Sequence, residues 1–115
     1  MKLLKVTIFL SHEKLKFNIR EYEVKETKNT FKITKELSSN QDIFSEKVIS
    51  KSAVGVVDSR FKNNINSSSP YISYSVWGFE KDLDSLKKIL KVKTEARLQE
   101  LKTGLEGIIK SFYKV

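Results

Sequence analysis

Apolar residues recur at every second position through the first part of the chain. The pattern covers residues 4–10, 15–26 and 29–35, with polar turns between them. A period of two is typical of strands that have one face on a core, so the second and third segments are predicted to form a long hairpin. After Ile19 the apolar phase slips by one residue, because the next apolar residue is Tyr22. A β-bulge produces such a slip and bends the strand, which favours a curled sheet.

Two further segments complete the predicted sheet. Val48, Ile49 and the stretch 54–57 suggest one or two short strands, with Gly55 at a bend. Residues 71–77 form the clearest strand of the chain. One side of this strand carries Ile72, Tyr74 and Val76, and the other carries Tyr71, Ser73, Ser75 and Trp77.

The last third of the chain has helical periodicity, which begins after Asp82, a residue that suits an N-cap. Its apolar residues form two stripes: Leu83, Leu86 and Leu90, then Leu98, Leu101, Leu105, Ile108 and Phe112 at spacings of 3, 4, 3 and 4. One helix reaching Tyr113 would be about 48 Å long, whereas a compact domain of this size has a radius of gyration of about 13 Å. We therefore expect two helices that part near residues 92–94. The alternative is one long helix whose second stripe zips against another copy, since its spacing matches a short coiled coil.

These elements fit one domain, because a chain of 115 residues can bury a modest core without disulfides or metal. Its 39% hydrophobic and 31% charged residues are ordinary for a folded chain and argue against disorder. We predict a single α+β domain over residues 1–115. It would comprise a curled, mostly antiparallel sheet or small pseudo-barrel at about 3–77, followed by one or two C-terminal helices at about 82–113.

The chain carries a formal net charge of +8, from 22 Lys and Arg against 14 Asp and Glu. The excess sits at the two ends, in residues 1–35 and 71–115, whereas residues 36–70 are balanced. Such an excess attracts a polyanion whatever the fold. If the two ends pack together, their lysines form one basic face; the alternative is a lysine-rich surface that only keeps the protein soluble.

Residues that support catalysis or metal binding are nearly missing from the sequence. There is no Cys and a single His, His12, in a charged turn, whereas a zinc site needs three or four ligands. Asp82 and Asp84 lie at a helix start, where carboxylates are stabilised by the helix dipole. Phosphate-loop and nucleophile-elbow motifs do not occur. We therefore expect no enzymatic activity, no cofactor and no metal.

The sequence also bears on location. Lys5 interrupts the first apolar run, and no stretch approaches the roughly 20 apolar residues of a membrane span. The absence of Cys suits a reducing compartment. We predict a cytoplasmic protein with no membrane partner.

Two places are candidates for contact with nucleic acid. If the apolar side of the 71–77 strand goes inward, Tyr71 and Trp77 form an exposed surface on which bases stack; otherwise the helices cover that face and both aromatics belong to the core. Arg60 and Lys62 precede a polar loop and either contact phosphates or are simply solvated. The candidate nucleic-acid-binding residues are Lys16, Arg20, Lys32, Arg60, Lys62, Tyr71 and Trp77.

The order of these segments resembles the PrgU-like small proteins of Gram-positive conjugative plasmids. The resemblance rests on residues 20–24 (REYEV), 31–33 (FKI), 52–56 (SAVGV) and 71–77 (YISYSVW), the last leading into a Lys- and Leu-rich helix. It spans most of the chain but includes no diagnostic motif, so no site residue is carried over from the family. The resemblance implies a β-barrel with helices similar to the PUA RNA-binding fold, and a regulator of conjugation or of adhesin expression.

We therefore expect non-catalytic binding of nucleic acid by a regulatory protein of a mobile genetic element, with RNA as the preferred partner. RNA is preferred over DNA because an aromatic sheet surface suits single strands, and no helix-turn-helix pattern offers a recognition helix. The alternative is a protein–protein module that dimerises, or docks on a host factor, through its C-terminal helix. The homodimer contact would comprise Leu98, Leu101, Leu105, Ile108 and Phe112.

Overall fold

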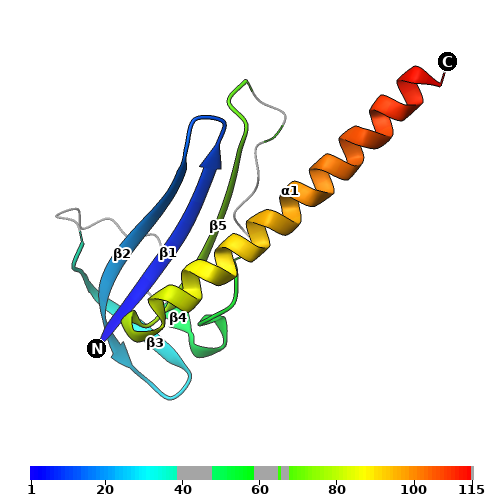
Figure 1. The fold of residues 1–115 in the computed structure, drawn as a ribbon. Coiled ribbons are helices and arrows are strands. Elements are labelled where there is room, and N and C mark those ends of the chain that lie inside the picture. Colours follow the sequence, from blue (N-terminus) through cyan, green and yellow to red (C-terminus); the bar gives the residue numbers. More distant parts are fainter. Residues whose placement is uncertain (39–47, 59–64, 66–67, 115) are drawn as a thin grey trace.

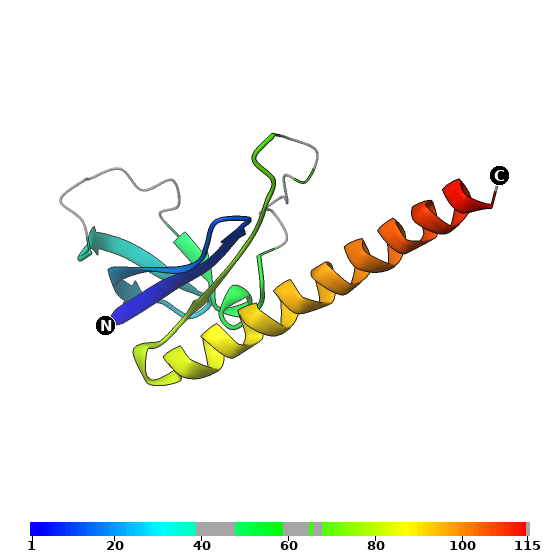
Figure 2. The same cartoon turned by 45° about the horizontal axis from the view of Figure 1, so that its top comes forward.

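The chain folds into a five-stranded sheet followed by one long helix, which confirms the predicted α+β class (Figure 1). The computed structural model describes residues 1–38, 48–58, 65 and 68–114. Along the chain its elements are β1 (Lys2–Ser11), β2 (Leu15–Glu26), β3 (Thr30–Glu36), β4 (Val48–Ser50), the 3-10 turn η1 (Lys51–Ala53), β5 (Tyr71–Gly78), the 3-10 turn η2 (Glu80–Asp82) and α1 (Leu83–Tyr113). The strand order is β4-β3-β2-β1-β5, every pair is antiparallel, and the sheet curls into a half-barrel (Figure 2).

The face of the sheet that meets α1 forms the first core. Its buried residues are Leu4, Val6 and Ile8 of β1, Ile72, Tyr74 and Val76 of β5, and Leu86 and Leu90 of α1. The predicted alternation along residues 71–77 is therefore confirmed. Each large aliphatic side chain that leaves water here stabilises the fold by about 1.5–3 kcal/mol.

The opposite, concave face closes on itself inside the curl and forms the second core. All five strands contribute to it, with Leu3, Tyr22, Val24, Phe31, Ile33, Ile49 and Trp77. Phe79 packs edge-on against Phe31, with 5.7 Å between the ring centroids. Since β5 contributes to both cores, nearly all of its residues are buried.

The apolar phase change in β2 does not come from a bulge after Ile19, so that expectation is wrong. The register between β1 and β2 runs without a break from Lys2–Glu23 to Leu10–Leu15. Ile19 therefore faces the first core and Tyr22 the second. The apolar residues of β2 that reach a core pack in the first core up to Ile19 and in the second core from Tyr22 onward. The register shift lies instead between β2 and β3, at Glu23/Val24. Opposite it, Thr34 of β3 donates a hydrogen bond from its Oγ1 to the carbonyl oxygen of Glu23 at 3.1 Å.

The segment after β4 runs along the free edge of β5 and continues the curl. The Gly55 amide donates to the carbonyl oxygen of Trp77 at 2.8 Å, and the Asp58 amide donates to that of Ser75 at 2.7 Å. Gly55 has a φ of 80°, a conformation that glycine adopts without steric cost. The predicted bend at Gly55 is thus confirmed. One of the two expected short strands is β4, and residues 54–57 form isolated bridges.

The helix α1 is continuous over 31 residues, so the expected division near residues 92–94 is wrong. Thr94 lies in the middle of this stretch, where it is buried and its Oγ1 donates to the carbonyl oxygen of Leu90 at 2.8 Å. Burial of this turn beside the sheet holds the helix through a stretch whose sequence is only weakly apolar. Asp82 occupies the N-cap position as predicted, although its side chain makes no capping hydrogen bond.

The second half of α1 projects beyond the sheet (Figures 1 and 2). The molecule consequently measures 62 × 27 × 21 Å and has a radius of gyration of 17.5 Å, against about 13 Å for a compact domain of this length. Every side chain from residue 102 to residue 114 is exposed. We call residues 102–113 the overhang. Within the described part of the chain, no helix has the length and apolar character to cross a membrane.

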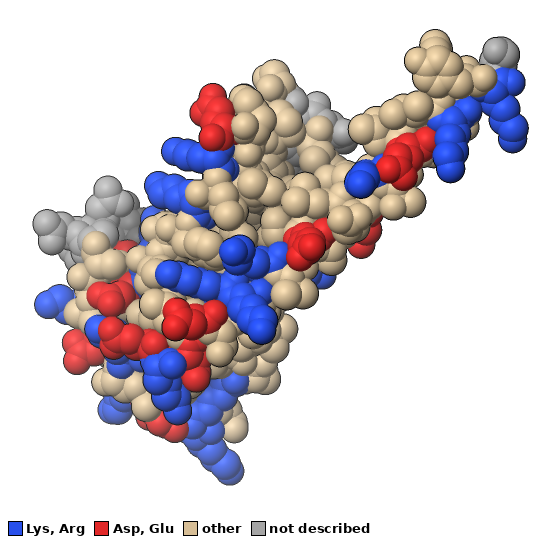
Figure 3. Space-filling model, in the orientation of Figure 1, with Lys and Arg blue, Asp and Glu red and all other residues tan. Residues whose placement is uncertain are grey.

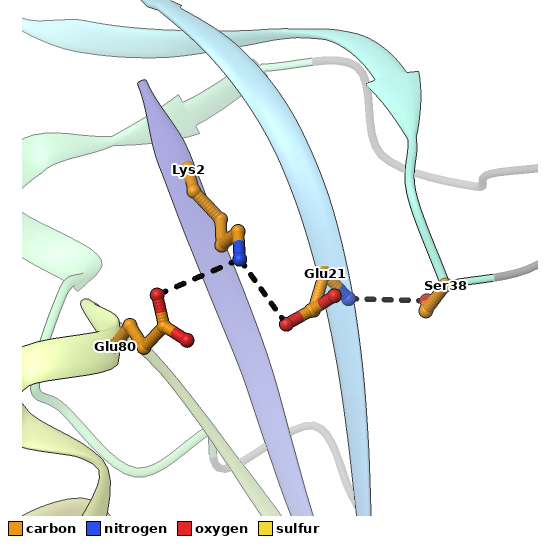
Figure 4. Close-up of polar contacts among 4 residues, drawn as sticks. All are labelled: Lys2, Glu21, Ser38 and Glu80. Carbon is orange, nitrogen blue, oxygen red and sulfur yellow. Dashed lines mark hydrogen bonds and ion pairs between the residues drawn. The ribbon is translucent and has the colours of Figure 1, made fainter.

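An ion-pair cluster ties the start of the chain to two other elements (Figure 4). The Lys2 Nζ lies 3.4 Å from Glu21 Oε1 on β2 and 3.5 Å from Glu80 Oε2 on η2. Ser38 Oγ accepts a hydrogen bond from the Glu21 amide at 3.1 Å. The hydrogen bond to Glu21, followed by the negative charges of Glu21 and Glu80, raises the pKa of Lys2 above its ordinary value.

Candidate nucleic-acid interface

Four of the predicted binding residues project from the concave face, opposite α1. Arg20 is the cross-strand neighbour of Lys5, which in turn neighbours Trp77. Four residues further along β1, Lys16 pairs with Phe9, and Tyr71 of β5 stacks on the Phe9 ring. Directly paired residues of antiparallel strands share a face. The fold therefore brings together Lys16, Arg20, Tyr71 and Trp77, and adds Lys5 and Phe9 to them.

The other three predicted residues are not part of this group. Phe31 and Ile33 point into the second core, so the exposed Lys32 between them points to the opposite side of β3. Arg60 and Lys62 lie outside the described residues.

Trp77 is a core residue, so its predicted role as an exposed stacking surface is wrong. Its exposed fraction is 4%, and its ring lies 5.3 Å from that of Tyr22 at an angle of 52°. The curl of the sheet wraps the second core around it, and the Val54 bridge covers the edge of β5 beside it. Above the ring stands the Lys5 Nζ, 5.3 Å from the centroid, close enough for a cation–π interaction.

The aromatic surface on this face is formed by Phe9 and Tyr71 instead. Their rings stack with centroids 5.2 Å apart and an angle of 25° between the ring planes. Both side chains are half-buried, so part of the pair stays open to solvent. Sequence reasoning overlooked Phe9, although its position in phase with Lys5 and Thr7 already placed an aromatic on the polar side of the first strand.

A buried carboxylate lies beside Arg20. Glu36 Oε1 is 3.8 Å from Arg20 Nη1, and the exposed fractions of the two side chains are 2% and 52%. Neither oxygen of Glu36 has a hydrogen-bond partner among the described residues, and the same is true of the buried Ser75 Oγ. The register shift at Thr34 puts Glu36 in line with Tyr22 on the concave side. Sequence reasoning missed Glu36, because an unbroken alternation after Ile33 does not reveal this shift.

Two cations of the concave face repel each other, and neighbouring groups offset part of this repulsion. Lys5 and Arg20 are like charges directly opposite one another, an arrangement that destabilises a strand pair. The Glu36 carboxylate beside Arg20 and the Trp77 ring under Lys5 offset part of that repulsion. An anion bound between the two cations would offset more of it.

Among the described residues, and on the side that Figure 3 presents, the positive charge does not form one continuous face. Several cations are paired with carboxylates, among them Lys2 with Glu21, Lys51 with Glu26 at 2.6 Å, and Arg97 with Glu100 at 3.0 Å. Figure 3 shows Lys and Arg interspersed with Asp and Glu over the sheet and along α1 on the side that it presents. Few of the described cations share a face and lack a neighbouring carboxylate. Lys16 is one of them, because it has no ion-pair partner among the residues that the structure describes.

Potential metal-ligating side chains do not cluster among the described residues. His12 is exposed in the β1–β2 turn, where its Nε2 lies 3.7 Å from the carboxylate of Glu13. The structure, in the parts of the chain that it describes, contains no group of three or more potential metal-ligating side chains. The concave face carries cations and an aromatic pair.

Comparison with known proteins gives no relative from which a role for these residues could be transferred: no family model, no curated protein and no solved structure matches the chain.

Proposed function

We propose that this protein binds single-stranded nucleic acid, RNA in preference to DNA, on the concave face of its sheet, and that it does so without catalysis. The observation that carries the proposal is the juxtaposition of Lys5, Lys16 and Arg20 with the half-exposed Phe9–Tyr71 pair. Cations that follow a backbone and aromatic rings that stack on bases are the two components of single-strand binding sites.

Each group has a distinct part in the proposed complex. Lys16 and Arg20 lie four residues apart on β2 and on the same face, which places them about 13 Å apart along the strand. That separation suits contacts to phosphates that are not adjacent. The open edge of the Phe9–Tyr71 pair receives a base, whereas Trp77 acts from the core by holding the Lys5 ammonium in place.

The resemblance to PrgU-like proteins supports RNA as the ligand and a regulatory role on a mobile genetic element. Its implied PUA-like barrel is consistent with the half-barrel found here. The proposed site itself rests on the concave face and not on the resemblance.

Salt dependence of binding to a labelled single-stranded RNA tests the proposal. With a few phosphate contacts, the affinity falls steeply as salt rises, by a slope of about 0.7 per contact for single strands on a double logarithmic plot. Lys16→Ala should weaken binding and reduce the slope by about that increment. Lys32→Ala removes the same charge from β3, on the side that points away from the concave face. It is therefore the matched control and should leave the slope nearly unchanged.

A second pair of measurements tests the aromatic part. Tyr71→Ala should weaken binding by about 1–3 kcal/mol if a base stacks there, without changing the salt slope. Equal losses for Lys16→Ala and Lys32→Ala, or binding that does not depend on salt, would show that the concave face is not the site.

A protein–protein module is the second candidate function, and the apolar side chains exposed on the second half of α1 favour it. The concave face and the overhang are different surfaces, so the two functions are compatible in one molecule.

A further inference from the structure

The apolar face of α1 that covers the sheet continues beyond the end of the sheet. Leu90 and Leu101 pack on the first core. At the same spacing, this face then carries Leu105, Ile108 and Phe112, whose exposed fractions are 59%, 68% and 72%. Single exposed apolar residues are ordinary, but a contiguous row of them marks a contact surface.

The overhang has little support beyond the last turn that contacts the sheet. Residues 102–113 include Gly104 and Gly107, each of which weakens a helix by up to about 1 kcal/mol relative to Ala, and most helical stability in proteins comes from packing of an apolar face. A Cβ added at either glycine would meet nothing within 4 Å, so the packing of the single chain accounts for neither. A second helix laid along the apolar row would bury these side chains and hold the overhang helical.

Two hollows flank Leu98 at the point where α1 leaves the sheet, with volumes of about 270 and 260 Å³. Tyr71 and Leu101 line the first, Leu15 lines the second, and Leu10 lines both. A cavity of about 150 Å³ holds a benzene ring, so each hollow has room for an aromatic side chain. The largest apolar side chain of the exposed row, Phe112, stands at the other end of the overhang.

We propose that the overhang pairs with the overhang of a second copy of this chain, antiparallel, about a two-fold axis near residues 106–107. In this register Leu105 lies against the partner's Ile108. Phe112 then reaches the partner's Leu101 and enters the hollow beside it. The contact is isologous, because one row of residues serves both copies, and it ends where the sheet of each copy begins.

Charge favours a second copy in this orientation. The overhang carries two Lys and one Glu, so two overhangs are almost neutral and repel each other little. The whole chain has a net charge of +8, and antiparallel pairing holds the two basic sheets at opposite ends. A parallel pair would bring the sheets together and leave the hollows without an aromatic side chain.

The paired helices alone bury too little surface for a specific interface, so the hollows must contribute to the contact. The row from Leu98 to Phe112 spans about two heptads, fewer than the three or four typical of a coiled coil. A specific interface buries about 1,200–2,000 Å² in total. Docking of Phe112 against Leu10, Ile72 and Leu98 in the first hollow supplies apolar contact that the helices alone lack.

Light scattering on the full chain tests the association. The wild-type protein should have twice its 13.3 kDa mass and dissociate on dilution. Leu105→Asn should weaken dimerisation by roughly ten- to a hundredfold, because it buries an amide without partners. Val92→Asn is the matched control: Val92 is likewise 59% exposed, but it lies about 140° away around the helix and should not affect the mass.

Cysteine pairing tests the orientation, since the natural chain has no cysteine. A Leu101→Cys chain mixed with a Phe112→Cys chain should form a mixed disulfide under mild oxidation, because antiparallel pairing brings these positions within bonding distance. Each variant alone should cross-link poorly.

Three results would overturn the proposal. A wild-type protein that stays monomeric at every concentration tested excludes the dimer. A dimer that withstands Leu105→Asn is formed through another surface. Self-cross-linking of Phe112→Cys in place of the mixed disulfide indicates a parallel pair. Leu105→Asn and Val92→Asn both change exposed side chains, so circular dichroism should show an intact sheet in each.

Discussion

The guanidinium of Arg20 lies 3.8 Å from the carboxylate of Glu36, so a half-exposed cation faces an acid that the fold has almost completely buried. Because Glu36 accepts no hydrogen bond from any described residue, Arg20 provides much of the compensation for its charge. Arg20 therefore has a structural role in addition to the contact with nucleic acid proposed for it.

Arg20→Ala should lower the free energy of unfolding by about 1–2 kcal/mol, because it leaves a buried carboxylate without its partner; the half-exposed position of Arg20 keeps the loss below the 3–5 kcal/mol of a fully buried pair. In a Glu36→Gln background the same substitution should cost distinctly less. Urea denaturation of the four proteins in this double-mutant cycle measures the coupling. Equal losses in both backgrounds would mean that the two side chains do not interact.

Gly78 and Gly107 should respond to alanine in opposite directions. A Cβ on Gly78 would overlap the side chain of Leu86, with Cδ2 at 2.8 Å, and Leu86 is 3% exposed and has little room to move. Gly78→Ala should therefore destabilise the fold by about 1–3 kcal/mol. Gly107 has open space around it, so Gly107→Ala should be neutral or stabilise α1 by up to about 1 kcal/mol. Thermal melts followed at a helical wavelength compare the two, and a stabilising Gly78→Ala would contradict the close contact between β5 and α1.

Docking of α1 on the sheet should depend on Leu90 and hardly on Ile89. Leu90 is fully buried in the first core, whereas its neighbour Ile89 is 39% exposed. Leu90→Ala should cost about 2–5 kcal/mol through lost burial and the cavity left behind, and Ile89→Ala less than about 1 kcal/mol. Chemical denaturation with matched m-values measures both. Similar losses at the two positions would show that another face of α1 meets the sheet.

The ion-pair cluster of Lys2 should add stability that disappears in alkali. Glu21 and Glu80 raise the pKa of Lys2 above 10.5 in the folded chain. Its contribution is therefore complete below the unfolded value and is lost as the pH rises through the folded one. Wild type should exceed Lys2→Met in unfolding free energy at neutral pH, and the gap should close above the raised pKa. A gap that stays constant into strong alkali would indicate that the charge of Lys2 is not responsible.

Strand alternation was enough to predict most of the sheet. Residues 71–77 alternate between two environments as their sequence indicates, and the hairpin of β2 and β3 forms where the polar turn predicts it. The same alternation placed Lys16 and Arg20 on one face of β2. It did not reveal that Phe9 and Tyr71 stack across two strands, because the periodicity of one segment does not show which strand lies next to it.

What the chain alone determined is local: which residues alternate, where the turns fall, and that the face of α1 from Leu98 to Phe112 is apolar. Tertiary structure decided everything that depends on which surfaces meet. Burial of Thr94 beside the sheet keeps α1 in one piece, curling of the sheet encloses Trp77, and the register shift at Thr34 turns Glu36 toward Arg20. The physical reason is that burial is a property of two surfaces in contact, and a periodic pattern describes only one of them.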